Sequence, residues 1–231
     1  MTSVLIVDDQ VLVRAGLAAL IAAAPGLDAV GQAADGHEAV ALAASLKPDV
    51  VLMDIRMPGL DGVQATERIV RNAEAPGCAV LILTTFDLDE YVYAALRAGA
   101  SGFLLKESPP DRLLAAIPTV AAGEMLFAPT VTRRLVEAYA HRQRSTIDIP
   151  PDLGALTARE LDVLRLVARG MTNAEIGRHL RVTEATVKTH LNRIMAKLGL
   201  ASRAQAVVVA YETGLVTPRR QQAGDPVVRD R

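Results

Sequence analysis

Short apolar runs alternate with amphipathic segments over the first half of the chain. Each run has the length of a buried strand and is bounded by turn residues; the runs lie near residues 3–7, 28–33, 49–53, 79–84 and 101–105. The segments between them have helical spacing, near 10–23, 36–46, 62–73, 88–98 and 109–122. This alternation predicts an α/β fold with a doubly wound, five-stranded parallel sheet.

The second half is helical throughout. Two capping boxes, at residues 157–160 and 172–175, place a threonine at the N-cap and a glutamate three positions later. Thr183 caps a third helix that ends at residue 198, and a fourth helix is predicted over 202–213. Two capped helices joined by a short turn indicate a helix-turn-helix within a small all-α four-helix domain.

These patterns divide the chain into four predicted parts. Residues 1–125 form the α/β domain, and residues 126–152 form a linker that contains a charged helix at 129–144. Residues 153–217 form the helix-turn-helix domain, and residues 218–231 form a polar, disordered tail.

Charge separates the two halves. Residues 1–125 carry 8 Lys/Arg and 16 Asp/Glu, a balance of −8, whereas residues 126–231 carry 17 and 10, a balance of +7. The basic half is therefore the candidate for binding nucleic acid.

The single cysteine, Cys78, excludes an internal disulfide and favours a reducing cytosol. No apolar run approaches the ~18 residues of a membrane span, so we expect a cytoplasmic protein without membrane contact.

Three acidic residues mark one edge of the predicted sheet. Asp8 and Asp9 follow the first apolar run, and Asp54 follows the third. The carboxyl ends of parallel strands form the active crevice of open α/β sheets, so these carboxylates should lie together. They would repel one another without a hard cation of the Mg²⁺ type. Each aspartate taken singly has a second interpretation, as a helix N-cap.

Such a pocket is suited to phosphoryl transfer onto a carboxylate. Asp54 would attack the phosphoryl group, while the cation offsets the negative charge of the transition state. Thr84 and Lys106 follow the fourth and fifth apolar runs and would supply a hydroxyl and an ammonium for the phosphoryl oxygens. An alternative interpretation of Lys106 is a solvated surface lysine.

The helix predicted over 184–198 has two distinct faces. An apolar stripe consists of Val187, Leu191, Ile194 and Leu198. A polar face has the short polar and cationic side chains that a recognition helix uses in a major groove: Lys188, Thr189, Asn192 and Arg193. Solvated helix charges are the alternative interpretation.

With these motifs assembled, residues 1–125 resemble a response-regulator receiver domain of the CheY type. The similarity lies in Asp8-Asp9, residues 54–62, Thr84-Thr85 and residues 99–106. The resemblance implies that Asp54 is the phosphoacceptor and that Thr84 and Lys106 contact the phosphoryl group. It implies that Mg²⁺ is held by Asp8, Asp9, Asp54 and the backbone carbonyl of Arg56, and that Phe103 is the rotating aromatic of the switch.

Residues 153–217 resemble the LuxR-type helix-turn-helix of NarL/FixJ-class response regulators. The matching stretches are residues 156–160, 170–176, 186–190, 197–200 and 202–206. The resemblance implies, by position, that Lys188, Thr189 and Asn192 contact DNA bases, with Arg193 on the same face. It implies that contacts to the DNA backbone are made by Thr172, Asn173, Thr186 and Lys197. The family's last helix pairs two subunits, which points to Ala206, Val207, Val209 and Ala210, with core packing as the alternative.

The combined hypothesis is a bacterial two-component response regulator. A sensor histidine kinase would phosphorylate Asp54, and this would control dimerisation and sequence-specific binding to a two-fold symmetric DNA site, so regulating transcription. RNA polymerase is a further candidate partner. The chain is predicted not to be an enzyme, apart from slow self-dephosphorylation.

The switch is expected to work through the fourth and fifth strands. Thr84 would move toward the phosphoryl group, and Phe103 would fill the vacated space from the surface. Pro118 lies inside the last predicted helix of this domain, where a proline costs about 3 kcal/mol and predicts a kink.

Two rival hypotheses remain. In the first, the protein binds DNA constitutively and its receiver serves only for dimerisation, so that Asp54→Ala leaves promoter activity unchanged. In the second, the acids belong to a metal-dependent phosphatase, which would require a substrate pocket with its own general acid.

Overall fold

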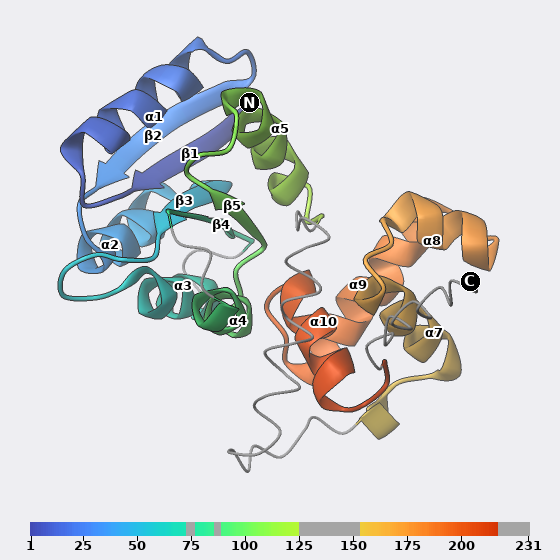
Figure 1. Ribbon diagram of the computed structural model, residues 1–231. Coiled ribbons are helices and arrows are strands. Elements are labelled where there is room, and N and C mark those ends of the chain that lie inside the picture. Colours follow the sequence, from blue (N-terminus) through green and yellow to red (C-terminus); the bar gives the residue numbers. More distant parts are fainter. Residues whose placement is uncertain (73–76, 86–88, 125–152, 217–231) are drawn as a thin grey trace, which may run out of the picture.

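The computed structural model describes residues 1–72, 77–85, 89–124 and 153–216, which form an α/β domain and a helical domain (Figure 1). The predicted helix at 129–144, the linker and the tail after residue 217 lie outside the described residues. Across the described ranges, no helix has the length and apolar character needed to cross a membrane.

The first domain is a five-stranded parallel sheet in the order β2-β1-β3-β4-β5. Its strands are β1 (Thr2–Val7), β2 (Leu27–Ala33), β3 (Val50–Asp54), β4 (Ala79–Thr84) and β5 (Gly102–Leu105). Its helices are α1 (Val11–Ala23), α2 (Gly36–Leu46), α3 (Gly62–Arg71), α4 (Asp89–Ala98) and α5 (Pro110–Ala121). The predicted doubly wound sheet is confirmed, and the strand order reverses between β1 and β3, where such sheets place a site.

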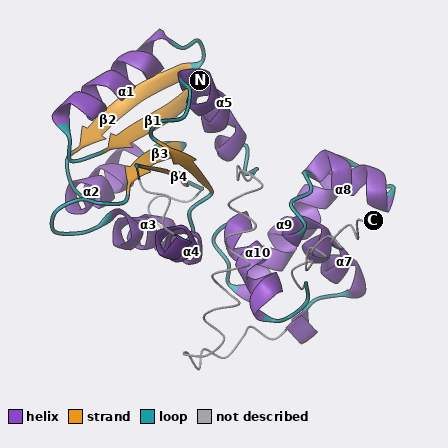
Figure 2. Cartoon of the chain, viewed as in Figure 1, coloured by secondary structure: helices purple, strands orange, loops and turns teal. Residues whose placement is uncertain are grey.

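Alternation along the buried strands builds two cores, one on each face of the sheet (Figure 2). Val4 and Ile6 belong to the core under α1 and α5. Leu5 and Val7 belong to the core under α2, α3 and α4. Because both faces are covered, the strands are apolar at nearly every position.

The second domain contains a short 3₁₀ turn and four helices: η1 (Leu153–Ala155), α7 (Ala158–Ala168), α8 (Asn173–Leu180), α9 (Glu184–Leu198) and α10 (Arg203–Glu212). Both predicted capping boxes are confirmed, and the Thr183 side chain caps α9. A Cβ on Gly177 would lie 2.8 Å from the Val182 carbonyl oxygen. This glycine therefore allows the turn between α8 and α9 to close tightly.

Pro118 does not end its helix. α5 continues through Pro118 to Ala121, and the proline ring is exposed to solvent. The Thr119 hydroxyl donates a hydrogen bond to the Ala115 carbonyl at 2.8 Å, which provides an additional bond in the turn that contains the proline.

The two domains meet where α10 packs against α4 (Figure 1). Ala204 and Val208 of α10 belong to the same buried apolar cluster as Val92 and Leu96 of α4. Polar contacts surround this cluster. The Tyr93 hydroxyl donates to Glu212 Oε1 at 2.6 Å, Arg97 Nε lies 3.8 Å from the same oxygen, and Gln205 Nε2 donates to the Arg97 carbonyl at 2.8 Å. We call this set the α4–α10 contact.

Candidate functional site

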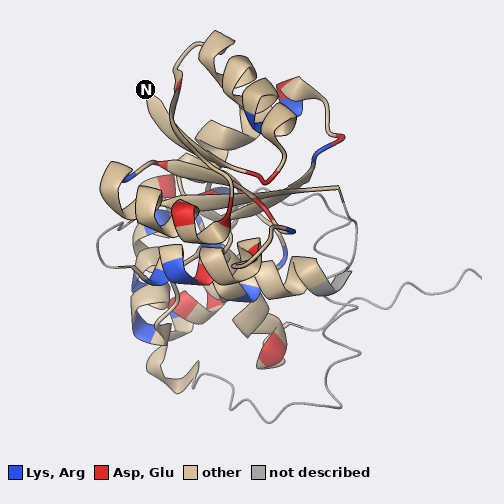
Figure 3. Ribbon diagram, turned by 90° about the vertical axis from the view of Figure 1, so that its left-hand side faces the viewer, with Lys and Arg blue, Asp and Glu red and all other residues tan. Residues whose placement is uncertain are grey.

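Acidic residues gather where β1 and β3 end, and Figure 3 shows acidic positions in red near the strands of the receiver. Carboxylate oxygens of Asp8, Asp9 and Asp54 all lie within 4.8 Å of one another. Asp8 and Asp54 are buried, with 1% and 5% of their surfaces exposed, whereas Asp9 is exposed. The pocket therefore opens to solvent on the side of Asp9.

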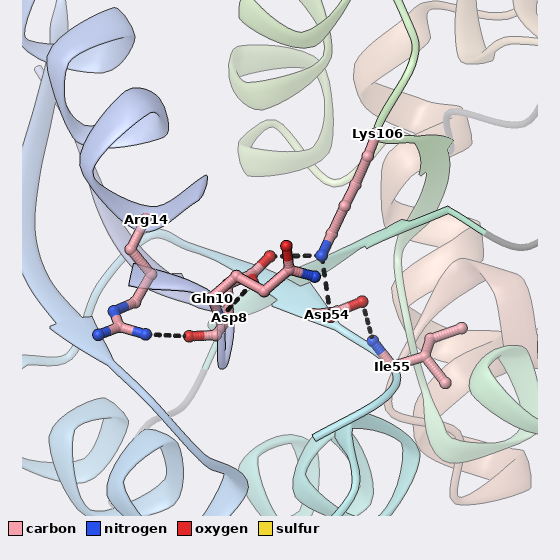
Figure 4. Close-up of polar contacts among 6 residues, drawn as sticks. All are labelled: Asp8, Gln10, Arg14, Asp54, Ile55 and Lys106. Carbon is pink, nitrogen blue, oxygen red and sulfur yellow. Dashed lines mark hydrogen bonds and ion pairs between the residues drawn. The ribbon is translucent and has the colours of Figure 1, made fainter. Parts of the chain in front are cut away.

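Backbone amides orient the two buried carboxylates (Figure 4). The Gln10 amide donates to Asp8 Oδ1 at 2.9 Å, and the Ile55 amide donates to Asp54 Oδ1 at 2.8 Å. Arg14 Nη1 donates to the Asp8 carbonyl oxygen at 2.5 Å and fixes the turn into α1. One oxygen of each carboxylate is thus held by the loop, and the other points into the pocket.

Lys106 bridges the two buried acids (Figure 4). Its Nζ lies 2.5 Å from Asp8 Oδ2 and 2.9 Å from Asp54 Oδ2. Burial raises the pKa of the Asp54 carboxyl above its ordinary value, and the charge of Asp8 adds to this against the opposing effect of Lys106. Burial lowers the pKa of Lys106, but its hydrogen bonds to Asp8 and Asp54 outweigh burial and keep that pKa above its ordinary value.

The donor set fits a divalent cation. Three carboxylates and one ammonium leave a local charge of −2, and one oxygen from each carboxylate lies within 4.8 Å of those from the other two. Oxygen ligands in a pocket that is partly open to water suit Mg²⁺, which keeps several of its water molecules.

Thr84 ends β4, the strand next to β3, and Phe103 lies in β5, the strand next to β4. Both are buried, with 2% and 3% exposed, and the Lys106 amide donates to the Thr84 carbonyl at 2.8 Å. Phe103 belongs to the cluster that contains Val92 and Leu96. The expectation that Phe103 enters from the surface therefore differs from this structure, in which its ring is already inside, beneath α4.

Asp49 has a separate structural role at the opposite end of β3. Its Oδ2 accepts hydrogen bonds from the Ser3 amide at 2.7 Å and the Ser3 hydroxyl at 2.8 Å. The bond from the Ser3 amide is the main cause that holds the pKa of Asp49 below its ordinary value. Asp49 therefore joins β1 to β3 and takes no part in the acidic pocket.

The polar face of α9 forms the candidate nucleic-acid interface. Val187, Leu191 and Ile194 are buried in the core of the helical domain. The four side chains predicted for this interface are all exposed on the same helix: Lys188, Thr189, Asn192 and Arg193. Thr186 lies at the beginning of the helix, where its hydroxyl is 2.8 Å from that of Thr183. Thr172 is an exposed N-cap at the beginning of α8.

Two further residues predicted to contact DNA make internal contacts in this structure. Asn173 is buried, and its Oδ1 accepts a hydrogen bond from Arg203 Nη1 at 2.5 Å. Lys197 Nζ donates to Glu160 Oε2 at 2.7 Å. These contacts join α8 to α10 and α9 to α7, so both side chains hold the helices in place.

The Glu160–Lys197 pair predicts an acid-sensitive part of the fold. The hydrogen bond from Lys197 is the main cause that lowers the pKa of Glu160 from 4.5 to about 2. Because the folded state holds the carboxylate ionised, this stabilisation is complete above about pH 4.5 and disappears as the pH falls to about 2. Lys197 is partly exposed and water screens the pair, so we expect Glu160→Gln to lower the free energy of unfolding by about 1 kcal/mol at pH 7.

Urea unfolding of the helical domain in the full chain, measured at several pH values, checks this prediction. The difference between wild type and Glu160→Gln should shrink as the pH falls from 4.5 to 2. Glu175→Gln is the matched control, because Glu175 occupies the same capping position in α8 but is exposed. A pH-independent difference for Glu160→Gln would contradict the assignment.

The candidate dimerisation residues of α10 are buried. Ala206, Val207 and Ala210 belong to the core of the helical domain, and Val209 is 5% exposed. The side of α10 that faces the receiver is formed by two other residues, Ala204 and Val208.

A cavity of about 200 Å³ lies between the domains and is lined in part by α9. Lys188 and Asn192 line one side, while Cys78 and Ser101 of the receiver line the other. Part of the candidate DNA face therefore points toward the receiver. Burial raises the pKa of the Cys78 thiol to about 12, with a smaller contribution from Asp49.

Sequence reasoning missed the contacts between elements that are distant in the chain. Tyr93, Glu212 and Arg203 were not selected, because no spacing or motif distinguishes them from ordinary helix residues. Only Glu160 carries a signal in the sequence, because it completes a capping box. The sequence does not show that Lys197, predicted to contact DNA, is its ion-pair partner.

Comparison with known proteins agrees with this architecture. The response regulator receiver domain matches residues 4–118, and the luxR family of bacterial regulatory proteins matches residues 154–210. The transcriptional regulatory protein LiaR of Bacillus subtilis is 41% identical over 94% of this chain and 100% of its own length. The nitrate/nitrite response regulator protein NarL of Escherichia coli K12 is 37% identical over 91% of this chain and 95% of its own length.

A solved structure extends the comparison. A LuxR-family two-component response regulator from Aurantimonas sp. SI85-9A1 superimposes with a TM-score of 0.55 at 34% identity, covering 61% of this chain and 99% of that one. Both domains and their order are thus accounted for. The chain belongs to the two-component response regulators that join a receiver domain to a LuxR-type helix-turn-helix and regulate transcription.

Proposed function

We propose that Asp54 accepts a phosphoryl group from a sensor histidine kinase and that this modification controls the binding of α9 to DNA. Asp54 Oδ2 would attack the phosphorus in line, while the bond from phosphorus to the kinase histidine breaks and its electron pair returns to the histidine nitrogen. The observation that carries this proposal is the enclosure of Asp54 by two other acids and the Lys106 ammonium, 2.9 Å away.

Mg²⁺ would be held in this pocket by Asp8, Asp9, Asp54 and the backbone carbonyl of Arg56. When bound, it would offset negative charge on the phosphoryl oxygens as they approach the carboxylates. Lys106 would exchange its contact with Asp54 for one with a phosphoryl oxygen, and the Thr84 hydroxyl would donate a hydrogen bond to another phosphoryl oxygen.

We place the receiver at residues 1–125, the linker at 126–152, the DNA-binding domain at 153–217 and the tail at 218–231.

The α4–α10 contact supports a resting state in which the DNA face is covered. Lys188 and Asn192, although exposed, line a cavity that the receiver also lines, so the domains would have to separate for a DNA duplex to lie along this part of α9. Phosphorylation would favour separation, because it changes the charge at the strand ends of the receiver, from which a change in α4 would reach the α4–α10 contact. Release would also free Ala204 and Val208, which offer an apolar face for pairing two subunits.

The dimer would then present two recognition helices to a two-fold symmetric DNA site. Lys188, Thr189 and Asn192 would contact base edges, while Arg193, Thr186 and Thr172 would contact the phosphate backbone. RNA polymerase would be the next partner, and self-dephosphorylation would reset the switch.

The test measures DNA affinity and mass with and without a phosphoryl mimic. Beryllofluoride with Mg²⁺ would be added to the full chain, with a duplex selected from a random-sequence pool. We expect affinity to rise by about 5- to 150-fold, the usual range for coupling between two sites. Sedimentation should show a dimer, and EDTA should remove both effects. Unchanged affinity and mass with the mimic bound would favour the constitutive DNA-binding hypothesis.

A further inference from the structure

Arg56 follows Asp54 by two residues in the chain, and its side chain contacts α4, the helix that packs against α10. Its side chain is exposed two residues after Asp54. The Arg56 guanidinium carbon lies 5.3 Å from the centroid of the Tyr91 ring, and Nη2 donates to the Tyr91 hydroxyl oxygen at 3.5 Å. The first distance indicates a cation–π contact and the second a long hydrogen bond, and together they join the loop after β3 to the first turn of α4.

Helix α4 is held from two sides. Tyr91 and Tyr93 are two positions apart, so at about 100° per residue they point to nearly opposite sides of the helix. Tyr91 faces Arg56 of the receiver loop, whereas Tyr93 donates to Glu212 of α10. Arg97, one turn after Tyr93, lies on the same side and meets the same carboxylate. A rotation of α4 that breaks one contact must therefore disturb the other.

We propose that Arg56 is a positioning residue that couples phosphorylation of Asp54 to the α4–α10 contact. The inference rests on the proposed function and adds a route separate from Thr84 and Phe103. In the resting state the guanidinium holds Tyr91 and keeps α4 in the orientation that Tyr93 and Arg97 need to reach Glu212. A phosphoryl group on Asp54 adds negative charge two residues from Arg56 and competes with the neutral ring for the guanidinium.

Electrostatics favour this transfer. An aromatic face attracts a cation only through its quadrupole, whereas a phosphoryl group offers full negative charge and acceptor oxygens in a bidentate arrangement. Once the guanidinium leaves, Tyr91 loses its contact and α4 is free to turn. The apolar packing of Ala204 and Val208 then has to hold the α4–α10 contact with weaker polar support.

The single cysteine reports the state of the domains. Cys78 is half-buried and lines the cavity beside Asn192 and Met195, so separation of the domains should expose its thiol. The rate of Cys78 alkylation by N-ethylmaleimide in the full chain therefore measures opening, and it does so without DNA.

We expect Arg56→Met and Tyr91→Leu to raise the alkylation rate without beryllofluoride by about two- to five-fold, the factor that corresponds to an exposed cation–π contact. Tyr91→Phe keeps the ring and loses only the long hydrogen bond to the hydroxyl, so its alkylation rate should stay closer to that of the wild type than the rate of Tyr91→Leu does. Arg71→Met is the control for loss of an exposed arginine, since the partner of Arg71 among the described residues is Glu67, in a solvent-screened surface pair of small stabilising effect. Glu212→Ala removes the polar contact directly and gives the rate of an opened state.

A second readout separates coupling from simple loss of stability. The ratio of alkylation rates with and without beryllofluoride should fall in Arg56→Met and Tyr91→Leu but stay at the wild-type value in Arg71→Met, while the receiver loses no more stability in urea than the lost contact accounts for. Wild-type rates and ratios in both variants would overturn the inference. A wild-type protein that ignores beryllofluoride in alkylation and in DNA binding would instead overturn the proposed function, so the two failures are distinguishable.

Discussion

Asp54→Asn is expected to abolish phosphoryl incorporation from acetyl phosphate and from a kinase. The substitution keeps the shape of the side chain and its hydrogen bond from the Ile55 amide, but it removes the nucleophilic oxygen that faces Lys106. Labelling of the full chain with a radioactive phosphoryl donor should fall to background. The affinity for DNA should then be the same with and without the donor.

Asp49→Asn is the matched control, because Asp49 lies at the opposite end of β3 and binds only Ser3 among the contacts described. It should retain full labelling. Stoichiometric labelling of Asp54→Asn, or its loss in Asp49→Asn, would place the phosphoacceptor elsewhere.

Gly62→Ala is expected to damage the same pocket through the backbone. A Cβ at residue 62 would lie 1.8 Å from the Asp54 carbonyl oxygen and 3.0 Å from the Ile55 Cα. Both neighbours are backbone atoms at the end of a central strand, so neither can move without displacing Asp54. We expect the free energy of unfolding of the receiver to fall by about 3 kcal/mol or more, the upper range for overpacking, with loss of labelling at Asp54.

Gly16→Ala provides the comparison for this experiment. Gly16 is an exposed residue of α1, and a Cβ there would meet nothing within 4 Å. Because alanine favours the helix, this variant should gain about 0.5–1 kcal/mol. Urea unfolding followed by circular dichroism measures both changes. Equal stability of the two variants would contradict the close approach at Gly62.

The acidic pocket was predictable because its members are fixed by strand ends. Parallel strands terminate at one edge, so Asp8 and Asp54 had to approach one another once their runs were recognised as strands. The exposed face of α9 was predictable for a similar reason, since helical spacing alone separates Lys188 and Asn192 from the apolar stripe.

Contacts between distant helices were not predictable from spacing. Asn173 and Arg203 are thirty residues apart, and their pairing depends on how α8 and α10 pack, which no local pattern encodes. Lys197 resembles any lysine near the end of a helix until α7 brings Glu160 to it. The same holds for Phe103, whose ring is covered by α4 and its neighbours.

The burial of α10 on several sides has a consequence for building chimeric regulators. Ala206, Val207 and Ala210 complete the core of the DNA-binding domain, while Ala204 and Val208 complete the apolar cluster of the receiver. A foreign output domain grafted after the linker would bring its own last helix and leave an unmatched gap on α4. Exchange of output domains between regulators therefore requires the receiver-facing residues of α10 to be transplanted together with the receiver, although they lie about 80 residues beyond its last helix.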